Sequence, residues 1–311
     1  MDLDTLLQRQ DGVVTRLQAL ETLTTGALQH RLSRRWQILL PGVYLTATGT
    51  PTERQRLRAA LLYGGPDAQL GDATALAVYG VRYLPRDPVV RLLLPANERR
   101  ANRDGVVVRR THRLPPPRNM NGLAYCPPER ALSDFATRIG NERIATAVLA
   151  DAIQRRIASR ELLLEELSHV TGRGAGIAAR AGRWIAAGAA SAPEADFLGL
   201  CQRSTVLPRP LLNPLIELPS GQRVSPDALF PDAGLVHETN GREHHAADDR
   251  FDDMQARHGA MTAAGLTVLH SSPRQIRSQA RRVLAELETT YRQYAGRGMP
   301  EGVRILSGAL P

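Results

Sequence analysis

The sequence contains no lysine: all forty of its basic residues are arginines, against 31 acidic residues, which gives a formal net charge of +9. No site in this chain can therefore use a lysine ammonium group. Any phosphate contact by a permanently charged side chain must be made by a guanidinium group, which binds oxyanions through two parallel hydrogen bonds. The excess of positive charge favours polyanionic partners.

Cysteine and long apolar runs are also scarce. The two cysteines, Cys126 and Cys201, lie far apart, which excludes a disulfide framework and a paired-cysteine zinc motif. The sequence contains no run of eighteen apolar residues, so it predicts no membrane span. The polar start MDLDTLLQRQ is not typical of a signal peptide. We therefore expect a cytoplasmic protein without a membrane partner, long enough at 311 residues for two or three domains.

Residues 1–60 have the pattern of a winged helix-turn-helix domain. We expect helices over 2–10, 15–23 and 24–33, followed by two short strands at 36–40 and 43–45. In that motif the helix before the strands enters the major groove of double-stranded DNA. The DNA-contacting candidates on this helix and just after it are Gln29, His30, Arg31, Arg34 and Arg35. The alternative is a helical domain whose arginines face solvent.

Residues 61–185 predict a mixed α/β domain. Strands are expected at 89–95 and 105–114, and helices begin at the Pro127-Pro128 pair and continue through residues 142–170. Between Pro85 and Arg118 nine arginines face three acids, a local charge of 9 − 3 = +6. These arginines either follow a DNA backbone or are scattered over exposed strands.

The third segment, residues 191–311, predicts a compact α/β domain. We expect a helix from Ser191, a hairpin of two strands at 211–219 and 223–231, and a further strand at 234–241. A helix that ends at Gly265, a strand at 266–272 and one long helix over 273–294 complete this domain.

Acidic side chains gather in this segment. Asp227 lies near the end of one expected strand and Glu238 lies on the next, so antiparallel pairing can bring both carboxylates to one sheet edge. Two such carboxylates suit Mg²⁺, which prefers oxygen ligands and keeps several waters. Glu194 can add a third acid, and His244 or His245 can serve as a general base or face a phosphate. Taken singly, each of these residues also fits a capping, ion-pairing or turn role.

These motifs resemble a known nuclease family. The order Pro226-Asp227, Glu238, Gly241, His244-His245, Arg257, Gly265 and Val268-Leu269-His270 is similar to the Vsr-like (very-short-patch-repair endonuclease-like) branch of the PD-(D/E)XK fold. The N-terminal two thirds resemble AbiEi-type antitoxins of type IV toxin–antitoxin systems, through DGVVTRLQAL and RRWQILLPGVYLT. The resemblances imply a winged helix-turn-helix, a mixed α/β middle domain and a restriction-endonuclease-like α/β domain.

One departure from the nuclease family bears on activity. Where the family has Glu-Val-Asp-Gly, this chain has Glu238-Thr239-Asn240-Gly241, so an amide replaces a carboxylate and weakens a site for Mg²⁺. Three hypotheses follow. The chain is a Mg²⁺-dependent DNA endonuclease with catalytic candidates Glu194, Asp227, Glu238, Asn240, His244 and His245, or a non-catalytic antitoxin-like transcriptional regulator that binds its operator as a homodimer. In the third, the middle domain has a purely protein-binding role, such as neutralising a partner toxin.

Overall fold

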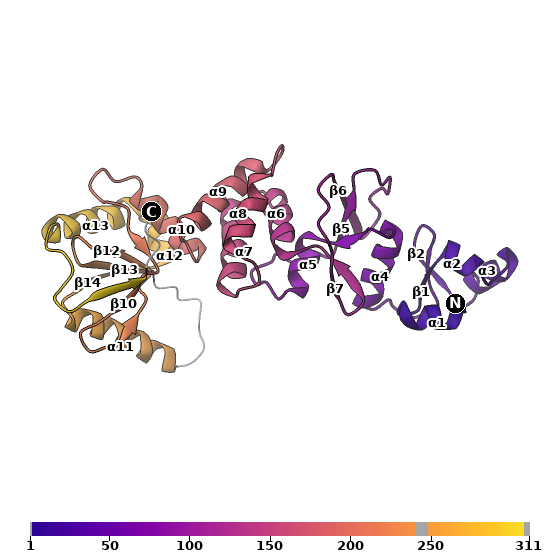
Figure 1. The fold of residues 1–311 in the computed structure, drawn as a ribbon, viewed down its shortest axis with the longest axis horizontal. Helices are drawn as coiled ribbons and strands as arrows, with labels where there is room; N and C mark the ends of the chain where they lie inside the picture. Colours follow the sequence, from indigo (N-terminus) through magenta and orange to yellow (C-terminus); the bar gives the residue numbers. More distant parts are fainter. Residues whose placement is uncertain (1, 240–247, 308–311) are drawn as a thin grey trace. The chain divides into compact units, whose positions relative to one another are not determined.

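The computed structural model describes residues 2–239 and 248–307 and has a mixed α/β architecture (Figure 1). The chain divides into two compact units: Met1–Gly140 with Arg156–Ala175, and Asn141–Arg155 with Gly176–Pro311. Within the described residues no helix is long and apolar enough to cross a membrane.

Unit 1 begins with three short helices and a three-stranded antiparallel sheet. The helices are α1 (Leu3–Arg9), α2 (Arg16–Leu20) and α3 (Thr25–Leu32); the sheet has the order β1 (Val13–Thr15), β3 (Val43–Leu45), β2 (Gln37–Leu40). Asp2, Thr15 and Thr24 cap the three helices through their side-chain oxygens. The apolar faces meet in one core of Leu3, Val14, Ala19, Leu28, Trp36 and Tyr44. The three helices and the two strands of the hairpin agree with the sequence-based expectation within a few residues, and β1 is an addition to it.

The rest of unit 1 is built on a five-stranded mixed sheet of order β6-β5-β4-β8-β7. Its strands are β4 (Gln69–Leu70), β5 (Val90–Pro95), β6 (Val106–Thr111), β7 (Arg118–Met120) and β8 (Leu123–Tyr125). Four helices belong to it: α4 (Glu53–Gly64), α5 (Asp72–Val78), α6 (Pro128–Arg138) and α8 (Arg160–Ser168). The fully buried Leu92, Leu93 and Leu94 place β5 in the centre of this core.

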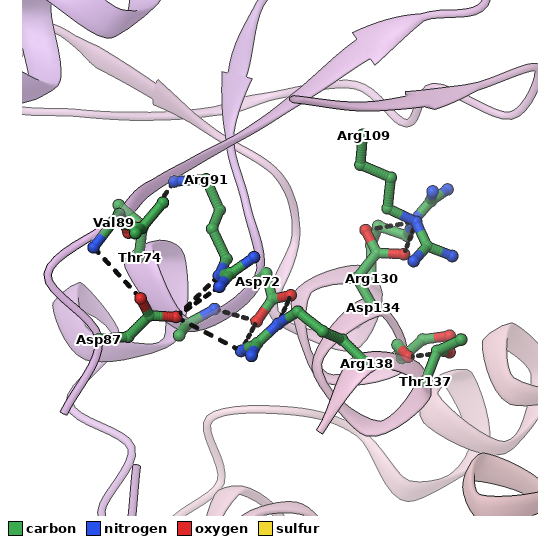
Figure 2. Close-up of polar contacts among 12 residues, drawn as sticks. Asp72, Thr74, Asp87, Val89, Arg91, Arg109, Arg130, Asp134, Thr137 and Arg138 are labelled. Carbon is green, nitrogen blue, oxygen red and sulfur yellow. Dashed lines mark hydrogen bonds and ion pairs between the residues drawn. The ribbon is translucent and has the colours of Figure 1, made fainter. Parts of the chain in front are cut away.

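Ion pairs join helices of unit 1 to one another and to strand β6 (Figure 2). Asp72 at the start of α5 receives two hydrogen bonds from Arg138, at 2.7 and 2.8 Å. Asp134 on α6 pairs with Arg109 and Arg130 at 2.9 and 3.0 Å, and is itself buried. Three of the nine arginines between Pro85 and Arg118 are neutralised in this way, since Arg91 pairs with Asp87, Arg109 with Asp134 and Arg113 with Glu166.

Unit 2 contains two small sheets. The first has the order β14 (Thr267–Ser271), β13 (Leu235–Thr239), β12 (Ala228–Phe230), β9 (Leu211–Leu212); the second has the order β11 (Arg223–Val224), β10 (Leu215–Glu217), β15 (Arg304–Ser307). The hairpin of β10 and β11 forms as expected. Each of the two expected strands, however, is split between the sheets, because Pro214 and Pro226 interrupt them and proline has no N–H to donate.

Helices cover both faces of the four-stranded sheet. Leu212, Ala228, Phe230 and Leu235 pack with α10 (Ala192–Cys201), α12 (Pro273–Ser278) and α13 (Ala280–Tyr294), whereas Leu229, Val236 and Val268 pack with Met261 of α11 (Asp248–Ala263). The unit also includes α7 (Glu142–Gln154) and α9 (Ala175–Ala186). The single helix expected over 273–294 was wrong: Gln279 adopts φ −127° and ψ 33° and separates α12 from α13.

Candidate functional site

The pairing of β12 with β13 brings Asp227 and Glu238 together. Ala228 pairs with His237, so Asp227, one residue before β12, lies opposite Glu238. Asp227 and Glu238 occupy the face of Leu229 and Val236, because side chains two apart on a strand share a face. The backbone N–H of Thr239 donates to Asp227 Oδ2 at 2.7 Å. The two carboxylates, separated by ten intervening residues in the sequence, are thus neighbours in space.

Burial makes both carboxyl groups reluctant to ionise. It raises the pKa of Asp227 to about 6, an effect that the Thr239 N–H opposes and the charge of Glu194 reinforces. Burial also raises the pKa of Glu238 to about 7, with repulsion from Asp227 as a further cause and Arg257 acting against it. A pair of carboxyls with pKa values near neutrality is typical of a site that exchanges protons or binds a cation.

Glu238 has one satisfied and one unsatisfied oxygen. Oε2 accepts a hydrogen bond from Arg257 Nη2 on α11 at 2.9 Å, whereas Oε1 is buried and has no partner among the described residues. A buried carboxylate oxygen without a partner costs about 1 to 3 kcal/mol or more. A cation beside this oxygen removes that cost, so the Asp227–Glu238 pair fits a hard metal ion such as Mg²⁺.

Glu194 lies on α10, and both oxygens of its carboxylate accept hydrogen bonds from the protein. Its Oε1 accepts from Ser191 Oγ at 2.7 Å, and its Oε2 accepts from the Ala190 N–H at 2.9 Å and from Asn213 Nδ2 at 2.6 Å. The backbone N–H of Asn213 in turn donates to the Asp227 carbonyl oxygen at 3.1 Å. Glu194 is therefore joined to Asp227 through Asn213, a residue that no sequence pattern had singled out.

Two histidines, His258 and His270, lie on the carboxylate side of the sheet, whereas His237 lies on its other face. His270 on β14 is the register partner of Glu238, and its Nε2 lies 3.0 Å from Nδ1 of His258 on α11. Burial and the charges of His258 and Arg257 lower the pKa of His270. His237 is fully buried and stacks on Phe197, with ring centroids 3.8 Å apart; burial lowers its pKa to about 3, so it is neutral. His258 and His237 were not anticipated, and His270 was noted only as part of the family motif.

The remaining expected site residues, Asn240, His244 and His245, lie outside the described residues. Among the described residues, no three His, Cys, Asp or Glu side chains gather closely enough to hold a metal ion. A metal at Asp227 and Glu238 would therefore keep several waters, which is the usual coordination of Mg²⁺ in proteins.

In unit 1 the five DNA-binding candidates lie on α3 and just after its end. Gln29, His30, Arg31, Arg34 and Arg35 are all exposed. The guanidinium of Arg31 lies over the Trp36 ring, 5.5 Å from its centroid, which fixes this arginine by a cation–π contact. Arg34 and Arg35 make no side-chain hydrogen bond or ion pair within the described part of the chain, so their guanidinium groups are open to solvent.

Comparison with known proteins adds little to this geometry. No family model matches the chain, and no curated protein matches it. Among solved structures, the chain is similar to the RV2827C protein from Mycobacterium tuberculosis, with 21% sequence identity and a TM-score of 0.40, over 58% of this chain and 73% of that one.

Proposed function

We propose that the protein is a DNA-binding protein whose restriction-endonuclease-like C-terminal region hydrolyses phosphodiester bonds with Mg²⁺. The observation that carries the proposal is the Asp227–Glu238 pair, with raised pKa values and an unpartnered Oε1 on Glu238. The order β12-β13-β14, with α11 against the face that bears the carboxylates, supports a PD-(D/E)XK-type arrangement.

The chain's own residues prepare this site for a cation. The Thr239 N–H orients the Asp227 carboxylate, and Arg257 orients Glu238 from the other side. Bound Mg²⁺ would polarise a phosphoryl oxygen and lower the pKa of a bound water. Because Glu238 has a pKa of about 7, binding must displace a proton, and affinity for Mg²⁺ rises with pH.

Nicking of supercoiled plasmid in Mg²⁺ or Mn²⁺ tests the proposal. We expect the wild type to nick and Asp227→Asn to lose activity by two orders of magnitude or more. Glu286→Gln, which neutralises an exposed acid on α13 in the same unit, should leave the rate unchanged. Cleavage that survives in Asp227→Asn would mean that the site is wrong or that a contaminant cuts.

Asn240 provides a second test of activity. If the amide merely weakens the metal site, Asn240→Asp should increase nicking and tighten Mg²⁺ binding measured by calorimetry, because it restores a charged oxygen ligand. No cleavage by either the wild type or Asn240→Asp would rule out the endonuclease.

Double-stranded DNA binding by residues 1–60 forms the other half of the proposal. The order α1-β1-α2-α3-β2-β3 supports a winged helix-turn-helix, with α3 in the major groove and the β2–β3 hairpin as the wing. Gln29, Arg31, Arg34 and Arg35 would then lie against DNA.

A non-catalytic regulator is the second candidate, and two observations favour it. Glu194 has its carboxylate occupied by protein donors, and the described residues contain no trio of metal-binding side chains. In this case the chain binds an operator as a homodimer and neutralises a toxin, without cutting DNA. Retention of an operator fragment by a chain that never nicks plasmid would favour the regulator.

We also propose a reducing, cytoplasmic location. Cys126 and Cys201 are both free and buried, and burial raises the pKa of Cys201 to about 12, which keeps this thiol protonated. Mass spectrometry after alkylation of the folded protein should find both thiols unmodified until the chain is unfolded.

A further inference from the structure

Four arginines line an open hollow where α12 gives way to α13. The hollow has a volume of about 620 Å³ and is lined by Arg203, Arg277, Arg281 and Arg282, with Ser278 and Gln279 between them. All four arginines are exposed, and no acidic residue lines the hollow. We call these four residues the α12–α13 arginine surface.

Most of this charge is not neutralised by the protein. Arg203, Arg281 and Arg282 make no ion pair or side-chain hydrogen bond to any described residue. Arg277 lies 3.7 Å from Asp196, but that carboxylate is shared with Arg143, which approaches it to 3.1 Å. Four guanidinium groups around one hollow repel one another, and a polyanion relieves that repulsion.

Some exposed arginines of unit 2 have acidic neighbours: Arg223 and Arg304 pair with Glu217, and Arg292 pairs with Glu288. Others, such as Arg183 and Arg209, have no ion pair among the described residues, but they do not line this hollow. The α12–α13 arginine surface is distinguished by the gathering of four guanidinium groups around one hollow. The first turn of α13 also lacks an acid and a side-chain cap, which leaves its backbone N–H groups available in addition to the guanidinium groups.

The arginine surface belongs to the same part of unit 2 as the carboxylate pair. β14 ends at Ser271, the register partner of Thr239, and the next residue, Ser272, caps α12. Helix α10 contacts α12 and carries both Glu194, which is joined to Asp227 through Asn213, and Asp196, which pairs with Arg277. Since α12 has six residues, it spans about 9 Å from the strand end to the hollow.

We infer that the α12–α13 arginine surface binds the phosphodiester backbone of duplex DNA without reading its sequence. Arginine forks match phosphate oxygens, and the hollow is lined mainly by cationic and polar groups, with Ala280 as its one small apolar residue. Its open form accepts a continuous polyanion rather than an enclosed small ligand. This inference deepens the proposed function and rests on it, since it adds a second DNA-contacting surface in the unit that carries the carboxylate pair.

Salt-dependent DNA binding by the full chain tests the inference. Fluorescence anisotropy with a labelled duplex of mixed sequence, repeated over a series of salt concentrations, gives the slope of log K against log salt. In Arg203→Gln/Arg281→Gln/Arg282→Gln the magnitude of this negative slope should decrease by about 2.7, that is by about 0.9 for each phosphate that the protein no longer neutralises. The corresponding triple replacement by lysine should keep most of the slope.

A charge-matched variant is the control. Arg183→Gln/Arg209→Gln/Arg297→Gln removes the same charge from exposed positions elsewhere in unit 2 and should leave affinity and slope nearly unchanged. Equal losses in the two glutamine triples, or an unchanged slope in the first, would overturn the inference. So would competition by polyglutamate as effective as that by DNA, which would assign the surface to acidic polypeptides.

The outcome is separable from that of the proposed nuclease activity. Asp227→Asn should bind DNA with the wild-type slope even though nicking is lost, because the arginine surface does not include the carboxylates. If the wild type never nicks plasmid but the Arg203→Gln/Arg281→Gln/Arg282→Gln variant still shows the expected change in salt slope, the endonuclease is overturned and this inference is supported. The exposed substitutions should leave the melting temperature within a few degrees of the wild-type value, as circular dichroism will check.

Discussion

The backbone N–H of Thr239 at the end of β13 donates to Asp227 Oδ2 just before β12, at 2.7 Å. The backbone of β13 thus orients the Asp227 carboxylate, which lies beside Glu238. This hydrogen bond partly offsets the cost of burying a carboxylate that also feels the charge of Glu194. Ionisation of these two carboxyl groups therefore lowers the free energy of unfolding, and this loss can be measured.

The pH dependence of stability should reveal the Asp227–Glu238 carboxyl pair. Burial raises the pKa of Asp227 from 3.8 to about 6 and that of Glu238 from 4.5 to about 7. Their contribution to folding is thus fully present below about pH 4 and is lost as pH rises through 6 and 7. Each pKa unit corresponds to about 1.4 kcal/mol, so we expect urea denaturation to show a loss of about 2 to 4 kcal/mol between pH 5 and 8.

Asp227→Asn should flatten that profile, because an amide does not ionise, and should raise the unfolding free energy at pH 8. The matched variant Glu286→Gln, at an exposed site, should keep the wild-type slope. A profile as steep in Asp227→Asn as in the wild type would place the titrating groups elsewhere.

The buried ion pair of unit 1 should be costly to break from one side. Asp134 and Arg130 have side-chain exposures of 4% and 9%, so Asp134→Ala leaves a guanidinium buried without its main partner. We expect a loss of about 3 to 5 kcal/mol in unfolding free energy. Arg304→Ala, which breaks the exposed pair with Glu217, should cost less than about 1 kcal/mol in the same denaturation experiment. Similar costs for the two variants would contradict this assignment.

Two glycines have left-handed backbone conformations, and their alanine variants distinguish the cost of backbone strain from that of a steric clash. A Cβ on Gly174, at φ +85°, would lie 1.9 Å from the Thr137 carbonyl oxygen, whereas a Cβ on Gly172, at φ +76°, meets nothing within 4 Å. Gly172→Ala should cost about 1 kcal/mol through backbone strain alone. Gly174→Ala should cost several times more, since the backbone around Thr137 must move. Differential scanning calorimetry compares the two, and equal melting temperatures would show that the clash relaxes freely.

Arg31 should behave differently from its neighbours at the end of α3. Arg34→Gln/Arg35→Gln is expected to weaken DNA binding by roughly tenfold or more at low salt without changing the melting temperature, because both side chains are exposed. Arg31→Gln should weaken DNA binding and also lower stability by about 0.5 to 1 kcal/mol, because it removes the cation–π contact with Trp36. Unchanged DNA affinity in both variants would move the DNA-binding surface elsewhere.

Local sequence signals predicted the parts of the fold that local interactions determine. Thr15, Thr24 and Ser191 mark helix starts because their hydroxyl groups cap the first turn, and the structure has α2, α3 and α10 after them. The approach of Asp227 to Glu238 was also accessible, since two strands joined by a short connection pair antiparallel.

Long-range features were beyond the reach of the sequence. Strand β15 pairs with β10, and Arg304 bonds to Glu217 across 87 residues, which no local pattern encodes. Similarly, Asn213 reaches Glu194, and His258 reaches His270, only because separate elements pack together. The break at Gln279 was missed because the residues around it are good helix formers, so tertiary packing decided against their propensity.

The route of the chain between the two units limits how the gene can be shortened. Residues 141–155, which hold α7, belong to unit 2, although residues 156–175 return to unit 1. A fragment that starts at Gly176 therefore lacks a helix that contacts α10, the helix of Glu194. A fragment that ends at Ala175 carries α7, whose Ala145, Val148 and Leu149 are buried in the full chain, without the α10 that it contacts. Neither unit is one continuous stretch of the sequence. The two units are therefore better studied by point substitutions or circular permutation than by truncation.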